Sequence, residues 1–192
     1  MEALRRDGVI IYPTDTGYAF GCALSSLKGI AKLRRLKGID DKSPKPLTML
    51  VNDLAEIGRY GHMGNRVFRV VRRLLPGPYT IVLEATAEVP RQMRNRWHEV
   101  GVRMPNHPTC SMLIDLLGEP LLTGSVSHYE SPLEFSLEEP EDYETRFGRD
   151  VQVVLDGGPL WPDPSTVLRL VGDEVEVIRE GQGEVPDDLR PP

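Results

Sequence analysis

Several polar side chains stand where a strand or a helix is predicted to end, and these are positions from which a side chain can reach a ligand. The first is Thr16, in the run Tyr-Pro-Thr-Asp-Thr-Gly (12–17) that follows a buried apolar segment. A hydroxyl beside a turn that glycine permits can hydrogen-bond a small polar ligand. The same threonines could instead serve only to cap the turn. We predict that this loop enters a pocket for a small polar ligand.

Two cationic residues occupy comparable places. Lys37 closes a predicted helix, and Arg103 ends a predicted strand. The helix dipole alone favours a lysine at a helix end, and an arginine at a strand end is usually solvated, so neither residue establishes a site by itself. His107 precedes Pro108 at the start of a predicted helix and is more readily explained as a cap of that turn than as a residue at a pocket rim.

Common nucleotide, metal and nucleophile motifs are missing from the sequence. It has no Gly-x-x-x-x-Gly-Lys-Ser/Thr phosphate loop, and Gly-Gln-Gly (181–183) is an isolated fragment near the C-terminus. The histidines lack the spacing of a zinc site, and neither cysteine belongs to a Cys-x-x-Cys pair. Ser125 has no Gly-x-Ser-x-Gly elbow. These absences disfavour a protein-held transition metal and an acyl-enzyme nucleophile.

The elements that must position these residues follow from apolar patterning and turn residues. Strands are predicted over residues 8–12, 47–51, 79–85, 100–103, 121–125, 151–156, 166–170 and 175–178. Helices are predicted from Ser25 or Ser26 to Gly38, over 67–75, and from 106–108 onward. A polar loop is expected through residue 21, and an exposed loop with a surface helix over 130–144. The pattern predicts an α/β protein with a mixed twisted β-sheet flanked by helices.

The bulk properties limit the class of protein. A length of 192 residues is enough for one domain, which we place at 1–185, followed by a loose tail at 186–192. Two cysteines and no apolar run of 18 residues predict a cytoplasmic protein without a membrane span. A formal net charge of -6 disfavours a surface coated for nonspecific nucleic-acid binding, so only a local basic face could serve that purpose.

Four segments carry a resemblance to a known family: Tyr-Pro-Thr-Asp-Thr-Gly-Tyr-Ala-Phe-Gly (12–21), Gly-Val-Arg-Met-Pro-Asn-His-Pro (101–108), Gly-Glu-Pro-Leu-Leu-Thr-Gly-Ser (118–125) and Pro-Ser-Thr-Val (164–167). Together with Pro-Gly-Pro-Tyr-Thr (76–80) and Val-Ile-Arg-Glu-Gly (177–181), they resemble the YrdC/YciO family. The resemblance implies an α/β domain with a concave ligand cavity. Family members of the YrdC type make threonylcarbamoyl-AMP and pyrophosphate from threonine, bicarbonate and ATP, as the first step toward threonylcarbamoyladenosine in tRNA.

The resemblance also implies roles for individual residues. ATP enters as a substrate and is expected to carry Mg²⁺ with it. Lys37 and Ser125 fall on positions that imply a catalytic role. The residues implied to bind threonine or bicarbonate are Thr16, Arg103, Thr123 and Ser165, and those implied to bind the nucleotide are Lys37, Ser125, Ser127 and Arg179.

Two departures from the family pattern resemble the YciO branch. The family's Lys-x-Arg is Lys-Gly-Ile here (37–39), and its Ser-x-Asn is Ser-Val-Ser (125–127). Ile39 cannot hydrogen-bond a phosphate, and losing a guanidinium from a triphosphate site costs on the order of 2–4 kcal/mol. We therefore expect reduced synthase activity. Cations that could replace the missing charge from nearby positions are Arg34, Arg35, Lys42 and Lys45.

Two other functions stay open at this point. One is binding of double-stranded RNA, which the resemblance implies for this family and which the basic helix surfaces would serve (Lys28, Lys32, Arg34, Arg35; Arg66, Arg69, Arg72, Arg73). Solvated helix faces explain those charges equally well. The other is nucleotide binding without synthase activity, which the two departures would permit.

Overall fold

A computed structural model describes residues 1–39, 47–93, 97–126, 139–172 and 174–190. The strands within these ranges form one sheet with the order β7-β1-β2-β6-β3-β5-β4-β8-β9. Their bounds are β1 (Ile10–Thr14), β2 (Gly17–Ala23), β3 (Thr48–Leu50), β4 (Tyr79–Glu84), β5 (Glu99–Arg103), β6 (Leu121–Ser125), β7 (Val153–Val154), β8 (Thr166–Val171) and β9 (Glu174–Arg179). The helices are α1 (Glu2–Arg5), α2 (Leu27–Leu36), α3 (Leu54–Tyr60), α4 (Asn65–Leu74), α5 (Pro108–Leu117) and α6 (Pro140–Phe147), with 3₁₀ turns η1 (Arg91–Met93) and η3 (Asp187–Leu189).

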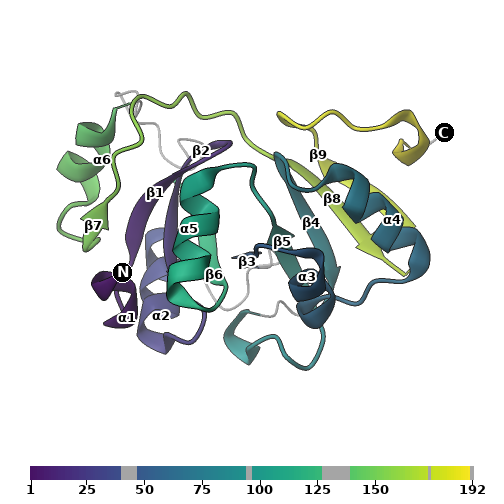
Figure 1. The fold of residues 1–192 in the computed structure, drawn as a ribbon, viewed down its shortest axis with the longest axis horizontal. Helices are drawn as coiled ribbons and strands as arrows, with labels where there is room; N and C mark the ends of the chain where they lie inside the picture. The colour runs from purple at the N-terminus through teal and green to yellow at the C-terminus, as the bar shows by residue number, and fades with distance from the viewer. Residues whose placement is uncertain (40–46, 94–96, 127–138, 173, 191–192) are drawn as a thin grey trace.

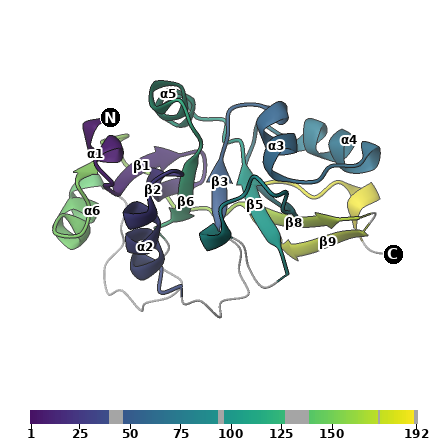
Figure 2. The ribbon, with the colours of Figure 1, turned by 90° about the horizontal axis from the view of Figure 1, so that it is seen from below.

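The sheet is mixed. β1 runs parallel to β7, β3 to β5 and β4 to β8, while the other neighbouring strands are antiparallel. Helices α3, α4 and α5 lie on one side of the sheet and α2 lies on the other (Figures 1 and 2). This arrangement confirms the predicted α/β class with a mixed twisted sheet flanked by helices.

Two of the predicted helix starts are formed by the residues that the sequence indicated. The Ser26 hydroxyl caps α2 by accepting a hydrogen bond from the Gly29 N–H. His107 caps α5, with Nδ1 accepting from the Thr109 N–H at 3.2 Å. The capping role predicted for His107 is therefore confirmed.

The polar loop predicted through residue 21 is wrong, because a second strand begins at Gly17. All seven residues of β2 are buried, and the strand lies between β1 and β6. The turn takes only Asp15 and Thr16, since Gly17 adopts a φ of 108°, in the region that favours glycine. Two glycines within β2 reduced the apolar signal that marks a buried strand.

The C-terminal segment is packed through residue 190 and is not a loose tail. Leu189 is buried in a large apolar cluster that includes side chains of α2, α3 and α4. The Arg190 guanidinium pairs with Glu180 at 2.8 Å. The predicted surface helix corresponds to α6, but Tyr143 in that helix is fully buried. The domain boundary at residue 185 stays a prediction.

Helices α1 and α3 were not predicted, because each is too short to show an apolar period. None of the helices among the described residues combines the length and the apolar character needed to cross a membrane.

Gly58, in the interior of α3, allows a first test of this fold. An added Cβ would meet only the Met63 Cε, at 3.4 Å, and the residue is exposed. We expect Gly58→Ala to raise the free energy of unfolding by about 0.5–1 kcal/mol, because alanine loses less conformational entropy in a helix. Urea denaturation followed by circular dichroism measures the change. A loss of stability would contradict the helical assignment of α3.

Candidate functional site

The turn between β1 and β2 displays the hydroxyl of Thr16. The Thr14 hydroxyl holds the turn, donating to the Gly17 carbonyl at 2.7 Å and accepting from the Thr16 N–H at 3.1 Å. A Cβ at Gly17 would lie 3.2 Å from the Pro162 Cα, so the segment before β8 passes closely over the turn. The sequence of this turn therefore fixes the Thr16 side chain at the tip of a hairpin.

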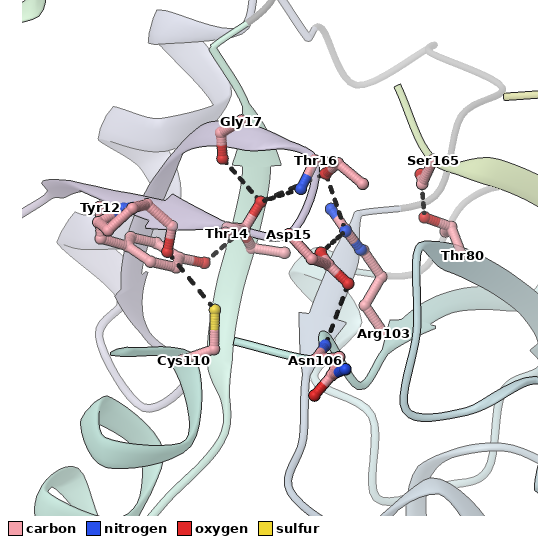
Figure 3. A network of polar contacts seen from close by, with 12 residues as sticks. Tyr12, Thr14, Asp15, Thr16, Gly17, Thr80, Arg103, Asn106, Cys110 and Ser165 are labelled. Atoms are coloured by element: carbon pink, nitrogen blue, oxygen red, sulfur yellow. Dashed lines mark hydrogen bonds and ion pairs between the residues drawn. The ribbon is translucent and has the colours of Figure 1, made fainter. Parts of the chain in front are cut away.

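Arg103, at the end of β5, reaches this turn across the sheet. Its Nη2 donates to Asp15 Oδ1 at 2.7 Å and to Thr16 Oγ1 at 2.9 Å (Figure 3). Asp15 Oδ2 accepts from the Asn106 N–H at 3.0 Å. Since β2, β6 and β3 separate β1 from β5 in the sheet, the contact joins the ends of two strands that are not neighbours. Thr16 and Arg103, both predicted, are brought together.

The Arg103 guanidinium is buried but incompletely bonded. The residue is 4% exposed, and its Nε has no hydrogen-bond partner in the part of the chain that the structure describes. Buried N–H donors in proteins are nearly always paired, because an unpaired one costs about 1–3 kcal/mol. An oxygen acceptor of a ligand would complete the bonding of this nitrogen.

Two further predicted residues contact each other, Ser165 just before β8 and Arg179 at the end of β9. The Arg179 Nε and Nη2 donate to the Ser165 carbonyl at 3.0 and 2.7 Å, and the Ser165 hydroxyl lies 2.9 Å from the Thr80 hydroxyl. Figure 3 draws the Thr80 and Ser165 pair together with the hairpin turn. A Cβ on Gly181 would lie 2.0 Å from the Pro164 carbonyl oxygen, so only glycine allows this close packing beside Ser165.

Lys37 and Ser125, which were predicted separately, also contact each other. The Lys37 Nζ donates to the Ser125 carbonyl at 2.7 Å, and its methylene chain passes over Gly124, where a Cβ would lie 3.2 Å from the Lys37 Cδ. Ser125 pairs with Ala19 of β2, three residues from Thr16, which places this pair about 10 Å along the strand from the hairpin turn.

The Thr123 hydroxyl makes its described hydrogen bonds within the sheet, and its predicted role in substrate binding stays a prediction. The residue is buried, its Oγ1 lies 2.6 Å from the Tyr12 hydroxyl, and it donates to the Phe20 carbonyl at 3.2 Å. These bonds join β6 to β1 and β2, so its described contacts are structural. Ser127, Lys42 and Lys45 lie outside the described residues.

The buried thiol nearest the turn is not prepared for nucleophilic chemistry. Cys110 Sγ lies 3.7 Å from the Pro13 carbonyl oxygen. Burial raises the pKa of the Cys110 thiol to about 12, with a partial offset from the positive charge of Arg103. The thiol is therefore protonated at neutral pH.

A cavity of about 380 Å³ lies beside the loop that follows Arg103. Its lining consists of Asn52, Pro76, Met104, Pro105, Asn106, His107, Pro108 and Ser111. His107 is thus at a cavity rim as well as at a helix cap, while none of the residues predicted to bind substrates lines this cavity. Within the described ranges, no three His, Cys, Asp or Glu side chains gather in a way that could hold a metal ion.

Sequence reasoning missed Asp15, Asn106 and Thr80. Each belongs to a segment that carried the resemblance, but none was singled out. For Asp15 a signal was present, because a carboxylate in a turn of small polar residues is available to a buried arginine. For Asn106 the contact uses the backbone N–H, which no side-chain pattern reveals.

Comparisons with known proteins identify the family of this chain. The Sua5/YciO/YrdC family model, described as "Telomere recombination", matches residues 2–181. The uncharacterized protein YciO of Escherichia coli K12 is 36% identical over 186 residues, covering 96% of this chain and 88% of YciO. The crystal structure of E. coli YciO matches with a TM-score of 0.87 over 95% of this chain and 87% of that one.

A relative with a named activity is more distant. Threonylcarbamoyl-AMP synthase of Mus musculus is 31% identical over 183 residues, covering 93% of this chain and 61% of the mouse protein. The structure of P. abyssi Sua5 complexed with L-threonine, at 23% identity, shares the fold with a TM-score of 0.80 over 94% of this chain and 52% of that one. The family match and these relatives place the chain in the Sua5/YciO/YrdC family.

Proposed function

We propose that this protein binds L-threonine, bicarbonate and ATP and joins them into threonylcarbamoyl-AMP, at reduced efficiency. The observation that carries the proposal is the contact between Thr16 and the buried Arg103, whose Nε still lacks an acceptor among the described residues. A carboxylate or carbamate oxygen is the acceptor that a guanidinium best accommodates. The mouse threonylcarbamoyl-AMP synthase, as a relative, supports the same reaction. The product would serve threonylcarbamoyladenosine formation in tRNA.

The proposed reaction has two bond-forming steps. The threonine amine adds to the carbon of bicarbonate, water is lost, and a carbamate results. A carbamate oxygen then attacks the α-phosphorus of ATP in line, the bond to the bridging oxygen breaks, and pyrophosphate leaves. Positioning and charge neutralisation supply most of the catalysis in transfers of this kind.

The three residue pairs divide these tasks. Arg103 and Thr16 orient the threonine and carbamate oxygens, and the Ser165 hydroxyl adds a further contact for threonine. Lys37 and Ser125 contact the phosphates, and Arg179 contacts the nucleotide. Magnesium enters as part of the ATP substrate, since Mg²⁺ in such sites is held largely by substrate phosphates and water.

The reduced efficiency is assigned to Ile39. Its side chain is partly buried and packs against the large apolar cluster, so it contributes to packing and offers no charge to phosphate. Arg35 is one of the cations that could replace the missing arginine, but its guanidinium already forms an ion pair with Asp150 at 3.6 Å.

Lys37→Ala tests the phosphate assignment. We expect pyrophosphate release from ATP, measured with threonine, bicarbonate and Mg²⁺ present, to fall about tenfold to hundredfold, since a hydrogen bond to a charged group contributes about 1.5–3 kcal/mol. Lys28→Ala is the matched control, because Lys28 lies on the helix that precedes Lys37 and its side chain is 86% exposed. Release that does not require all three substrates, or that Lys37→Ala leaves unchanged, would refute the assignment.

Nucleotide binding without turnover is a second candidate, favoured by the packing role of Ile39. Calorimetry of ATP binding distinguishes the two functions. Saturable ATP binding that Lys37→Ala weakens, without pyrophosphate release in the wild type, would select the second candidate.

A further inference from the structure

A second cationic site lies on α4, among residues that the proposed function does not use. Arg66, Arg69 and Arg73 recur at spacings of three and four, which places them on one face of the helix. With Val70, Asp188 and Leu189, they line a cavity of about 260 Å³.

The lining is strongly positive. The lining contains three guanidinium groups and one carboxylate, which belongs to Asp188. The Arg73 Nη2 donates to both oxygens of this carboxylate, at 3.1 and 3.0 Å. No acidic group among the described residues lies within 4.0 Å of Arg69. Like charges three and four residues apart destabilise a helix, so helix stability does not account for this arrangement. An anion bound among these groups would offset the repulsion between them.

Two of the residues that line the cavity are buried apolar side chains. Val70 and Leu189 are 7% and 4% exposed, and the 3₁₀ turn η3 that carries Asp188 and Leu189 packs onto β9. The volume is below the range of about 300–1,000 Å³ that encloses a drug-sized ligand. A small anion, or one anionic group of a larger molecule, fits this space.

We propose that Arg66, Arg69 and Arg73 form a binding site for a phosphate dianion, either free phosphate or the phosphate group of a small metabolite. The planar guanidinium fork matches phosphate oxygens in bidentate geometry. The excess of positive over negative groups in the lining complements the charge of the ligand. The site is separate from the pairs formed by Thr16, Lys37 and Ser165.

Titration calorimetry with inorganic phosphate at low ionic strength tests the proposal. Arg69→Gln is expected to weaken binding at least tenfold. Arg72→Gln is the matched control, because it removes the same charge from an exposed residue of the same helix that does not line the cavity. Absence of saturable phosphate binding to the wild type, or equal weakening by both variants, would overturn the proposal.

Further measurements distinguish this site from the candidate ATP site and from a general polyanion surface. Lys37→Ala should retain the phosphate binding that Arg69→Gln loses, which excludes the candidate ATP site as its source. Glycerol 3-phosphate in place of phosphate shows whether an esterified phosphate is the better ligand.

Duplex RNA binding that depends equally on Arg66, Arg69, Arg72 and Arg73 would make α4 a polyanion surface and overturn the small-ligand site. Pyrophosphate release by Arg69→Gln should equal that of the wild type, so either proposal can fail alone.

Discussion

Replacing Arg103 with methionine is expected to abolish threonine binding and to lower the free energy of unfolding by about 3–5 kcal/mol. The side chains of Arg103 and Asp15 are 5% and 11% exposed, and their 2.7 Å pair connects the turn after β1 to the end of β5. Methionine fills much of the same volume but leaves the Asp15 carboxylate with the Asn106 N–H and without its cation. Urea denaturation measures the stability, and calorimetry measures threonine binding.

Two companion variants separate the effect on stability from the effect on binding. The double variant Asp15→Asn, Arg103→Met removes the unpaired carboxylate and should recover part of the lost stability, but no threonine binding. Arg103→Lys retains the charge but not the planar fork, so threonine affinity should still fall at least tenfold. If Arg103→Met bound threonine as tightly as the wild type, Arg103 would be a structural residue only.

The sequence named several residues that lie in the candidate site, but not all of the residues that they contact. Thr16 and Arg103 lie at the ends of strands, and the sequence indicates such ends through turn residues and the period of apolar residues. Their contact depends on a sheet order in which β1 and β5 are separated by three strands. Local patterns do not encode that order. The resemblance named both residues, and the fold supplied Asp15 as the group that joins them.

The largest structural error in the prediction has the same physical origin. Strand β2 was predicted as loop because Gly17 and Gly21 interrupt its apolar pattern. In the fold, a Cβ at Gly21 would lie 2.6 Å from the Tyr12 ring, so this glycine makes room for an aromatic side chain of the neighbouring strand. The glycine in this strand therefore allows the Tyr12 ring to pack closely against the backbone. The sequence of β2 alone cannot show this, because the ring comes from the neighbouring strand.

Tyr143 gives the sharpest contrast between sequence and structure. As part of a predicted surface helix, it should tolerate alanine with a change within about 0.5 kcal/mol. In the fold it is fully buried, and its ring lies 4.5 Å from the ring of Tyr18. We expect Tyr143→Ala to lower the free energy of unfolding by about 3–5 kcal/mol, the range for deleting a large buried aromatic ring. Urea denaturation measures the change.

The consequence of that substitution should also extend to the hairpin turn. The Tyr18 hydroxyl accepts from the Gly157 N–H at 2.9 Å and donates to the Gly158 carbonyl at 2.8 Å. The ring of Tyr143 therefore supports the residue that anchors the segment passing over Gly17. Threonine affinity, measured under conditions where the variant stays folded, should fall as well.

Two control variants test whether the buried ring is the cause. Tyr143→Phe keeps the ring contact and should be less destabilising than Tyr143→Ala. Thr145→Ala, at an exposed position of the same helix, should stay within about 0.5 kcal/mol of the wild type. If Tyr143→Ala matched Thr145→Ala, the Tyr143 ring would not support Tyr18, and the hairpin turn would be held by the Thr14 hydroxyl and by the bonds of Tyr18 to Gly157 and Gly158.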